Sequence, residues 1–202
     1  MVRLLALDTS SAFTSVALLN HTTIIARNKH SPMQHGHAIL PIIQALFQET
    51  SLTCFDLDGV VFGCGPGSFT GTRIASCVAQ GLACIAGCPV MLISSLAAFA
   101  QTVYLQHQWT KLHIILDAQM GKVYSGVYQI NASGYAEVVG KERLCKEKEI
   151  DSLDAGEGWR EIRGDQHSKL FPSAEALLAL LQTKHHQENW VSPTEALPVY
   201  LC

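Results

Sequence analysis

The first half of this 202-residue chain has little charge. Residues 1–100 contain four basic and four acidic side chains, which leaves much weakly polar surface and favours an interface there. Along the whole sequence, Lys and Arg form no cluster and are not interleaved with aromatic residues. A protein that holds a phosphate backbone by itself usually has a basic stripe. If a nucleic acid is involved, we expect another chain to make most of the contact.

Common metal-binding and nucleotide-binding patterns are also missing. The seven cysteines include no C-x-x-C pair, and no two of the nine histidines are four residues apart. The helical H-x-x-x-H spacing of a zinc site is therefore absent. Gly71-Thr72-Arg73 differs from the Gly-Lys-Ser/Thr end of a Walker A loop. His35-Gly36-His37 is the best remaining metal candidate, and we interpret it as the polar start of a helix.

Cysteine usage predicts a cytoplasmic location. Most cysteines lie among apolar residues and are typical of small core residues in a reducing compartment. The chain opens as a strand, and we expect no signal peptide.

A hydrophobic content of 48% argues against disorder, except in the charge-rich run at residues 141–151. No membrane span is expected, because the apolar run after residue 72 is interrupted by Gln80 and closed by Gly87-Cys88-Pro89.

A glycine-rich stretch at residues 63–71 joins an apolar strand to a helix that begins near Thr70 or Thr72. Its sequence is Gly-Cys-Gly-Pro-Gly-Ser-Phe-Thr-Gly, which favours a tight turn. Two interpretations stay open. Unpaired N–H groups at the helix start would form an anion site, or the glycines only allow a close approach between backbone segments. The residues concerned are Gly65, Gly67, Ser68, Thr70 and Gly71.

The helix after this loop has no polar face. Arg73 and Gln80 are its only strongly polar side chains. We expect its large residues to pack on a sheet and its small residues to form a smooth opposite side. Because a helix without a polar face is buried on more than one side, that side should lie in a large core or dock onto another protein. The large residues are Ile74, Val78, Leu82 and Ile85.

The order of apolar segments predicts a duplicated α/β fold. Strands are expected at residues 2–7, 15–19, 22–27, 59–63 and 90–93 of the first half, and at 112–116, 122–130 and 135–139 of the second. Helices are expected at 37–48, 70–87, 95–105 and 173–186. Each half opens with an apolar strand that ends in an aspartate and a polar turn. The matching points are Asp8, Thr9 and Ser10 in one half and Asp117 in the other.

This duplication predicts a degenerate, two-lobed fold of the actin, hexokinase and Hsp70 type, in which each lobe is a mixed sheet with helices. The lobes are expected at residues 1–100 and 101–202, with the C-terminal segment crossing back to the first lobe. In such ATPases, paired hairpin turns hold phosphates and a metal between the lobes. Asp8 would then be either part of such a site or a cap that satisfies backbone N–H groups of its own turn. We favour the cap.

Five segments, in the same order along nearly the whole chain, resemble the TsaB (YeaZ) family. The string Gly-Pro-Gly-Ser-Phe-Thr-Gly is the most specific of them. The segments are Leu7-Asp8-Thr9-Ser10, Gln34-His35-Gly36 leading to Leu40-Pro41, the run from Gly65 to Ile74, the turn from Asp117 to Tyr124, and Pro198-Val199-Tyr200-Leu201.

The resemblance implies a role in making threonylcarbamoyladenosine in tRNA. A TsaB protein supports its paralogue TsaD, which carries the metal-binding histidines and transfers the threonylcarbamoyl group, and the P-loop ATPase TsaE joins the pair. The chain itself is then expected to be a non-catalytic scaffold that requires no cofactor, with ATP and metal on partner subunits. It would form a homodimer when alone, and would meet tRNA mainly through the complex.

The family docks through its first-lobe helices, here residues 35–50 and 70–87. The resemblance implies contacts from His35, Ile39, Ile43, Phe47, Arg73, Cys77, Ala79, Gln80 and Ala83. Gln119 and Lys122 replace the Arg and Glu of the family's Asp-Ala-Arg-x-Gly-Glu-Val-Tyr turn, which argues against chemistry there. The alternative is a free-standing enzyme, an ATP-using phosphotransferase or a peptidase. Ser68 directly follows Gly67, which does not match the G-x-S-x-G elbow of hydrolases.

Overall fold

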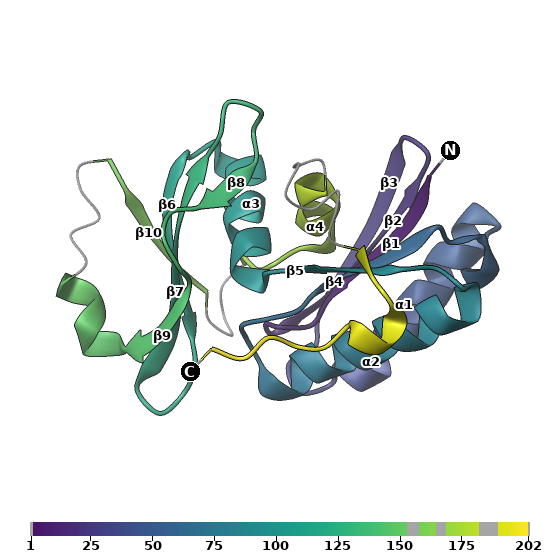
Figure 1. Cartoon of the computed structure of the whole chain (residues 1–202), viewed down its shortest axis with the longest axis horizontal. Coiled ribbons are helices and arrows are strands. Elements are labelled where there is room, and N and C mark those ends of the chain that lie inside the picture. The colour runs from purple at the N-terminus through teal and green to yellow at the C-terminus, as the bar shows by residue number, and fades with distance from the viewer. Residues whose placement is uncertain (1, 153–157, 165–168, 182–189, 202) are drawn as a thin grey trace.

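The computed structural model describes residues 2–152, 158–164, 169–181 and 190–201. It contains two sheets, with helices between and beside them (Figure 1). The first lobe comprises β1 (Arg3–Asp8), β2 (Phe13–Asn20), β3 (Thr23–His30), α1 (His35–Thr50), the 3-10 helix η1 (Cys54–Asp56), β4 (Gly59–Gly63), α2 (Phe69–Ala86) and β5 (Val90–Ile93). Helix α3 (Ser95–His107) leads into the second lobe, with β6 (Lys111–Asp117), β7 (Lys122–Ile130), β8 (Ala136–Val138), β9 (Arg143–Lys146), η2 (Glu147–Ser152) and β10 (Arg160–Gly164). The chain continues with α4 (Ala174–Leu180), β11 (Trp190–Val191) and η3 (Pro193–Glu195).

The two sheets repeat one topology. In the first, β1 pairs antiparallel with β2 and parallel with β4. In the second, β6 pairs antiparallel with β7 and parallel with β10. The full orders are β11-β5-β4-β1-β2-β3 and β10-β6-β7-β8, with β9 also paired to β7. This repeat confirms the predicted fold class, a two-lobed protein of mixed sheets and helices.

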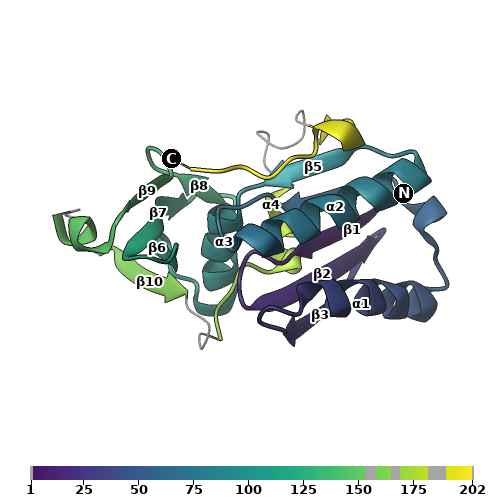
Figure 2. The ribbon, with the colours of Figure 1, turned by 90° about the horizontal axis from the view of Figure 1, so that it is seen from below.

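The central strands β1 and β4 of the first sheet are buried on both faces, whereas the edge strand β3 is largely exposed. Alternate side chains of a strand point to opposite sides of the sheet. Leu5 and Leu7 of β1 pack with residues of α1 and α2. Leu4 and Ala6 of the same strand join a core cluster that also contains residues of α3, α4 and the second sheet. Figure 2 shows α1 and α2 lying on the same face of the first sheet. A single core therefore connects the two lobes.

Several predicted boundaries differ from those of the structure. Residue 100 falls within α3, which packs against β6, β7 and β8, so the change of lobe comes before it. The predicted helix at 173–186 corresponds to α4, and residues 182–189 lie outside the described part. The expectation of disorder at residues 141–151 is wrong, since β9 pairs with β7. No helix in the described ranges is long and apolar enough to cross a membrane.

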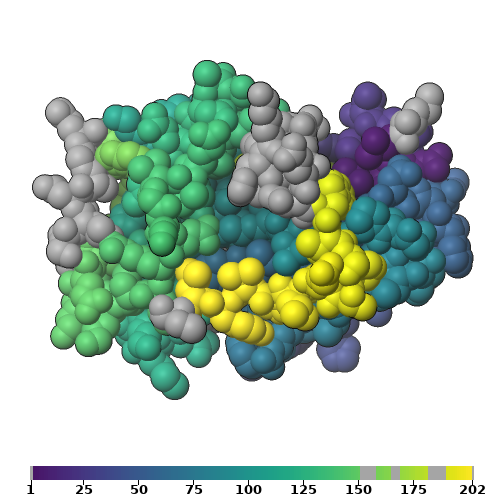
Figure 3. Space-filling view, in the orientation of Figure 1, coloured from purple at the N-terminus to yellow at the C-terminus, as the bar shows by residue number. Residues whose placement is uncertain are grey.

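Residues 190–201, called here the C-terminal strap, return to the first lobe. Strand β11 adds to the edge of the first sheet by pairing with β5. The carbonyl oxygen of Ala196 then accepts hydrogen bonds from Ser76 Oγ (2.6 Å) and Gln80 Nε2 (3.1 Å) of α2. Further on, the Val199 N–H donates to the carbonyl of Cys64 (2.8 Å). The strap lies on the surface and runs from the first lobe toward the second (Figure 3).

Candidate functional site

Asp8, at the end of β1, is fully buried and acts as the cap of its own turn. Its Oδ1 accepts hydrogen bonds from the backbone N–H (2.8 Å) and the hydroxyl (2.7 Å) of Ser10. Its Oδ2 accepts a bond from the hydroxyl of Ser95 (2.9 Å). Burial raises the pKa of the carboxyl to about 6, although these three bonds lower it. Two of the three bonds come from Ser10 of the same turn, as the cap interpretation expects.

Close approach to this turn explains the glycines of the glycine-rich loop. A Cβ on Gly71 would lie 1.8 Å from the carbonyl oxygen of Thr9, and one on Gly67 would lie 2.5 Å from that of Ser10. The Thr9 hydroxyl donates to the carbonyl of Gly71 (2.6 Å), and the Ser68 N–H donates to that of Ser10 (2.7 Å). Of the two interpretations left open by the sequence, close packing of backbone segments therefore accounts for Gly67 and Gly71.

The start of α2 is also capped from within. Ser68 Oγ accepts from the Gly71 N–H (3.2 Å), and the Thr72 N–H bonds to the Ser68 carbonyl (2.8 Å). Thr70 is exposed, and Gly65, at φ +97°, takes a left-handed conformation that favours glycine.

The glycine-rich loop also contains a buried cysteine, and burial raises the pKa of the Cys64 thiol to about 12. That thiol stays protonated at neutral pH and is a poor nucleophile.

A cleft of about 240 Å³ separates the loop from the second lobe. It brings together five of the predicted residues, Ser10, His35, Gly67, Ser68 and Asp117. Asp8 does not line it, because its carboxylate points into the core. The two aspartates that mark the duplication therefore do not face each other. Pockets that hold drug-sized ligands usually measure about 300–1,000 Å³, so this cleft is small for a nucleotide.

The cleft does not assemble hydrolytic chemistry. His35 is buried, its Nδ1 pairs with the Thr14 hydroxyl (2.9 Å), and burial lowers its pKa. In the described part of the chain, neither Ser68 nor Asp117 forms a hydrogen bond to this ring. Asp117 instead accepts from the Gln119 N–H (2.7 Å) within its own turn. Among the same residues, no group of three His, Cys, Asp or Glu side chains is placed to hold a metal.

The predicted orientation of α2 is only partly right. Its buried face consists of small residues, while Ile74, Val78 and Leu82 are half-buried and pack at the margin of the same core cluster. Ile85 is 55% exposed. Small side chains are needed on the inner side because α2 crosses β4 closely and passes over the Thr9 carbonyl. The buried residues of the helix are Gly71, Thr72, Ala75, Ser76, Ala79 and Ala83.

Five of the predicted contact residues are buried in this chain. Their side chains pack mainly in its own interior, although His35 also lines the inter-lobe cleft, and their contact with a partner stays a prediction. They are His35, Ile39 and Ile43 of α1 and Ala79 and Ala83 of α2. Arg73 and Cys77 are exposed, and Phe47 and Gln80 are half-buried. Gln80 is already bonded to the C-terminal strap.

The outward side of α2 carries an exposed aromatic cluster that the sequence analysis missed. Phe69 is 58% and Tyr200 50% exposed. The Arg73 guanidinium lies 3.6 Å from the centroid of the Phe69 ring, and its Nε donates to the Tyr200 hydroxyl (3.0 Å). A hollow of about 410 Å³ adjoins the cluster, lined by Phe69, Thr70, Arg73, Ile74, Cys77 and Val78. The spacing of Phe69 and Arg73, one helical turn, was the available signal.

Comparisons with known proteins agree with this architecture. Residues 23–178 match the family model described as TsaD, tRNA N6-adenosine threonylcarbamoyltransferase. The two-lobed fold and the match to this family model together define the class of the chain, a tRNA-modification protein. Proteins named tRNA threonylcarbamoyladenosine biosynthesis protein TsaB are similar over nearly their full length. The protein of Escherichia coli K12 is 31% identical to this chain, and the alignment covers 99% of this chain and 94% of that protein. The protein of Haemophilus influenzae is 33% identical, and the alignment covers 98% of this chain and 92% of that protein.

Solved structures give the same result. One, titled YeaZ from Pseudomonas aeruginosa, has a TM-score of 0.86 at 32% identity. Another, from the same organism and titled as similar to peptidase YEAZ, has a TM-score of 0.90 at 33% identity. Both alignments cover all of each chain. The chain belongs to the TsaB (YeaZ) family, which acts in tRNA threonylcarbamoyladenosine biosynthesis.

Proposed function

We propose that this chain is a non-catalytic scaffold subunit that binds TsaD and, with it, TsaE. The observation that supports this role is the outward side of α2, where Phe69, Arg73 and Tyr200 form an exposed cluster beside an apolar hollow. Aromatic residues and Arg are enriched at the centres of protein interfaces. Leu40 on α1 is 55% exposed, and α1 lies on the same face of the sheet as α2 (Figure 2).

The active chemistry is proposed to reside on the partners. ATP and metal bind there, this chain requires no cofactor, and tRNA is held mainly by the complex. A stable interface buries about 1,600 Å² in total, which the outward sides of α1 and α2 would largely supply. In the absence of TsaD, the same surface is proposed to pair two copies of this chain.

Co-purification with TsaD, followed by a modification assay with and without this chain, tests the proposal. Cys77→Arg places a charge in the middle of the outward side of α2, at an exposed position where we expect the fold to be retained. We expect at least a tenfold loss of TsaD affinity and a matching loss of tRNA modification. Gln106→Arg adds the same charge at an exposed position of α3 and should change neither. Full binding by Cys77→Arg, or ATP turnover by the isolated chain, would contradict the proposal.

A further inference from the structure

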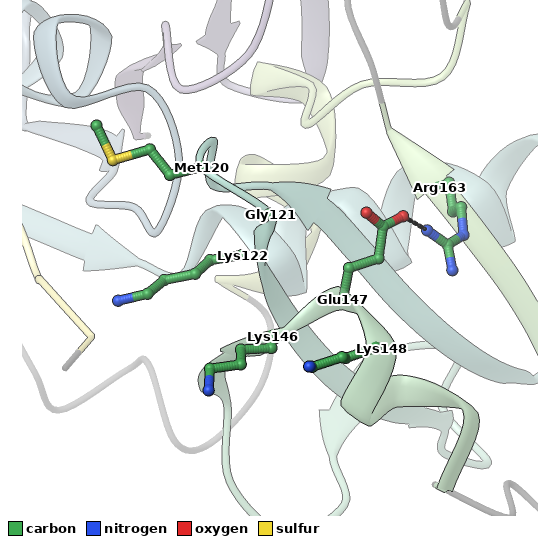
Figure 4. Close-up of a pocket in the computed structure, with 7 residues that line it drawn as sticks. All are labelled: Met120, Gly121, Lys122, Lys146, Glu147, Lys148 and Arg163. Carbon is green, nitrogen blue, oxygen red and sulfur yellow. Dashed lines mark hydrogen bonds and ion pairs between the residues drawn. The ribbon is translucent and has the colours of Figure 1, made fainter.

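A second pocket, of about 490 Å³, lies in the second lobe and shares no lining residue with the inter-lobe cleft. Four basic residues, Lys122, Lys146, Lys148 and Arg163, line it together with Glu147 and the tip of the preceding turn. In Figure 4 the ammonium groups of the three lysines lie to one side of the Glu147–Arg163 pair. The expectation that Lys and Arg form no cluster is therefore wrong in three dimensions.

Strand register brings these residues together. Lys122 begins β7 and lies directly opposite Lys146 in β9. Lys148 follows two positions later in η2, whose first residue, Glu147, donates its N–H to the Gly121 carbonyl (3.0 Å). This bond holds η2 against the turn before β7. The three lysines are thus fixed around one pocket by backbone pairing.

The three lysines have no counter-ion among the residues that the structure describes. Arg163 is neutralised by Glu147 (2.9 Å) and Glu161 (2.7 Å). By contrast, Lys122, Lys146 and Lys148 are exposed and form no ion pair with any described residue. The nearby Glu149 carboxylate accepts from the backbone N–H of Lys146 (3.1 Å). Like charges placed directly across two strands destabilise a sheet, so an anion from outside the chain would relieve a real cost.

We propose that this pocket binds the phosphate backbone of RNA. Lysine ammonium groups act as flexible point charges, which suit phosphate contacts that position a nucleic acid without reading its bases. No aromatic side chain is among the described residues that line the pocket, and these residues offer a nucleobase no stacking surface. These two features favour a backbone over a free nucleotide.

This inference rests on the proposed function, because an RNA substrate is what brings a phosphate backbone to the complex. It assigns this subunit a direct contact with the RNA, in addition to the contact made by its partner. Lys122, Lys146 and Lys148 would each neutralise one phosphate. Counter-ion release then makes the affinity fall steeply with salt.

Fluorescence anisotropy with a labelled, unmodified tRNA transcript tests the site on the full chain. The variant K122Q/K146Q/K148Q should raise the Kd at least tenfold at about 100 mM salt, and should lower the slope of log Kd against log salt by about 2–3. The matched control K29Q/K111Q/K169Q removes three exposed lysines outside the pocket and should change the Kd less than twofold. Thermal unfolding should confirm that both variants are folded.

Three results would overturn the inference. The first is an equal loss of RNA affinity in the two triple variants, and the second is that the unaltered chain binds no RNA at about 50 mM salt. The third is that millimolar ATP displaces the RNA completely and that RNA binds no more tightly than ATP. The last result would assign the pocket to a nucleotide. Failure here is distinguishable from failure of the proposed function, because the lysine triple variant should still co-purify with TsaD.

Discussion

The hydroxyl of Ser95, in the first turn of α3, donates a 2.9 Å hydrogen bond to the buried carboxylate of Asp8, at the end of β1. The same Ser95 oxygen accepts from the backbone N–H of Gly65 (3.2 Å). One side chain therefore connects the first strand, the glycine-rich loop and the helix that leads into the second lobe.

The first prediction concerns the pH dependence of stability. Burial raises the pKa of Asp8 from 3.8 to about 6, so the folded chain binds more protons than the unfolded chain between these values. Stability contributed by this group is therefore present below about pH 4 and falls as pH rises to about 6, by about 3 kcal/mol in all. Asp8→Asn should remove this dependence. Urea unfolding of both proteins at several pH values gives the difference curve, and a flat curve would contradict the prediction.

The second prediction separates two glycines of α2. Gly71→Ala should destabilise the protein by several kcal/mol or prevent folding, because the new Cβ meets the Thr9 carbonyl at 1.8 Å. Gly81→Ala is the matched control on the same helix, where a Cβ would meet nothing within 4 Å. It should stabilise by about 0.5–1 kcal/mol through helix propensity. Thermal unfolding measures both, and equal shifts would refute the close-packing account.

The third prediction tests the corrected orientation of α2. Ala79→Arg should abolish cooperative unfolding, because Ala79 is 0% exposed beneath the helix and a guanidinium has no room or partner there. Cys77→Arg, two residues earlier and exposed, should leave the midpoint of thermal unfolding within about 2 °C. Circular dichroism on both variants decides the point. A stable, folded Ala79→Arg protein would restore the original prediction of an outward-facing small side.

The fourth prediction concerns the C-terminal strap. Ser76 and Gln80 both donate to the carbonyl of the buried residue Ala196. Either Ser76→Ala or Gln80→Ala leaves this oxygen one donor, whereas the double variant leaves none. We expect the double variant to lose about 1–2 kcal/mol more than the sum of the single variants. A double-mutant cycle from urea unfolding measures this coupling, and additive losses would show that the two bonds act independently.

The sequence located the regular elements well, since their apolar periods are strong. The predicted strands at 90–93 and 122–130 coincide with β5 and β7. It could not choose between the two interpretations of the glycine-rich loop, because the choice depends on the Thr9 and Ser10 carbonyls, which lie far away in the sequence. Proximity of this kind is created by the fold and leaves no local signal.

Two errors about surfaces have the same origin. Ile85 was assigned to the sheet by size, yet it is 55% exposed, and the fully buried residues of α2 are all small. The lysine cluster was missed because Lys122 and Lys146 meet through the pairing of β7 with β9. Residue type and spacing predict which segments form, whereas the distances between segments decide which side chains remain outside.

The hydrogen bond between Tyr200 and Arg73 has a practical consequence for anyone who purifies this protein. An affinity tag fused after Cys202 would be separated from Tyr200 by two residues and would hinder access to the aromatic cluster. A tag at the amino terminus would begin next to β1, at the far end of the molecule from the carboxyl end in Figure 1. Binding measurements should therefore use amino-terminal fusions, and any homologue tagged at its carboxyl end should be compared only after the tag has been cleaved.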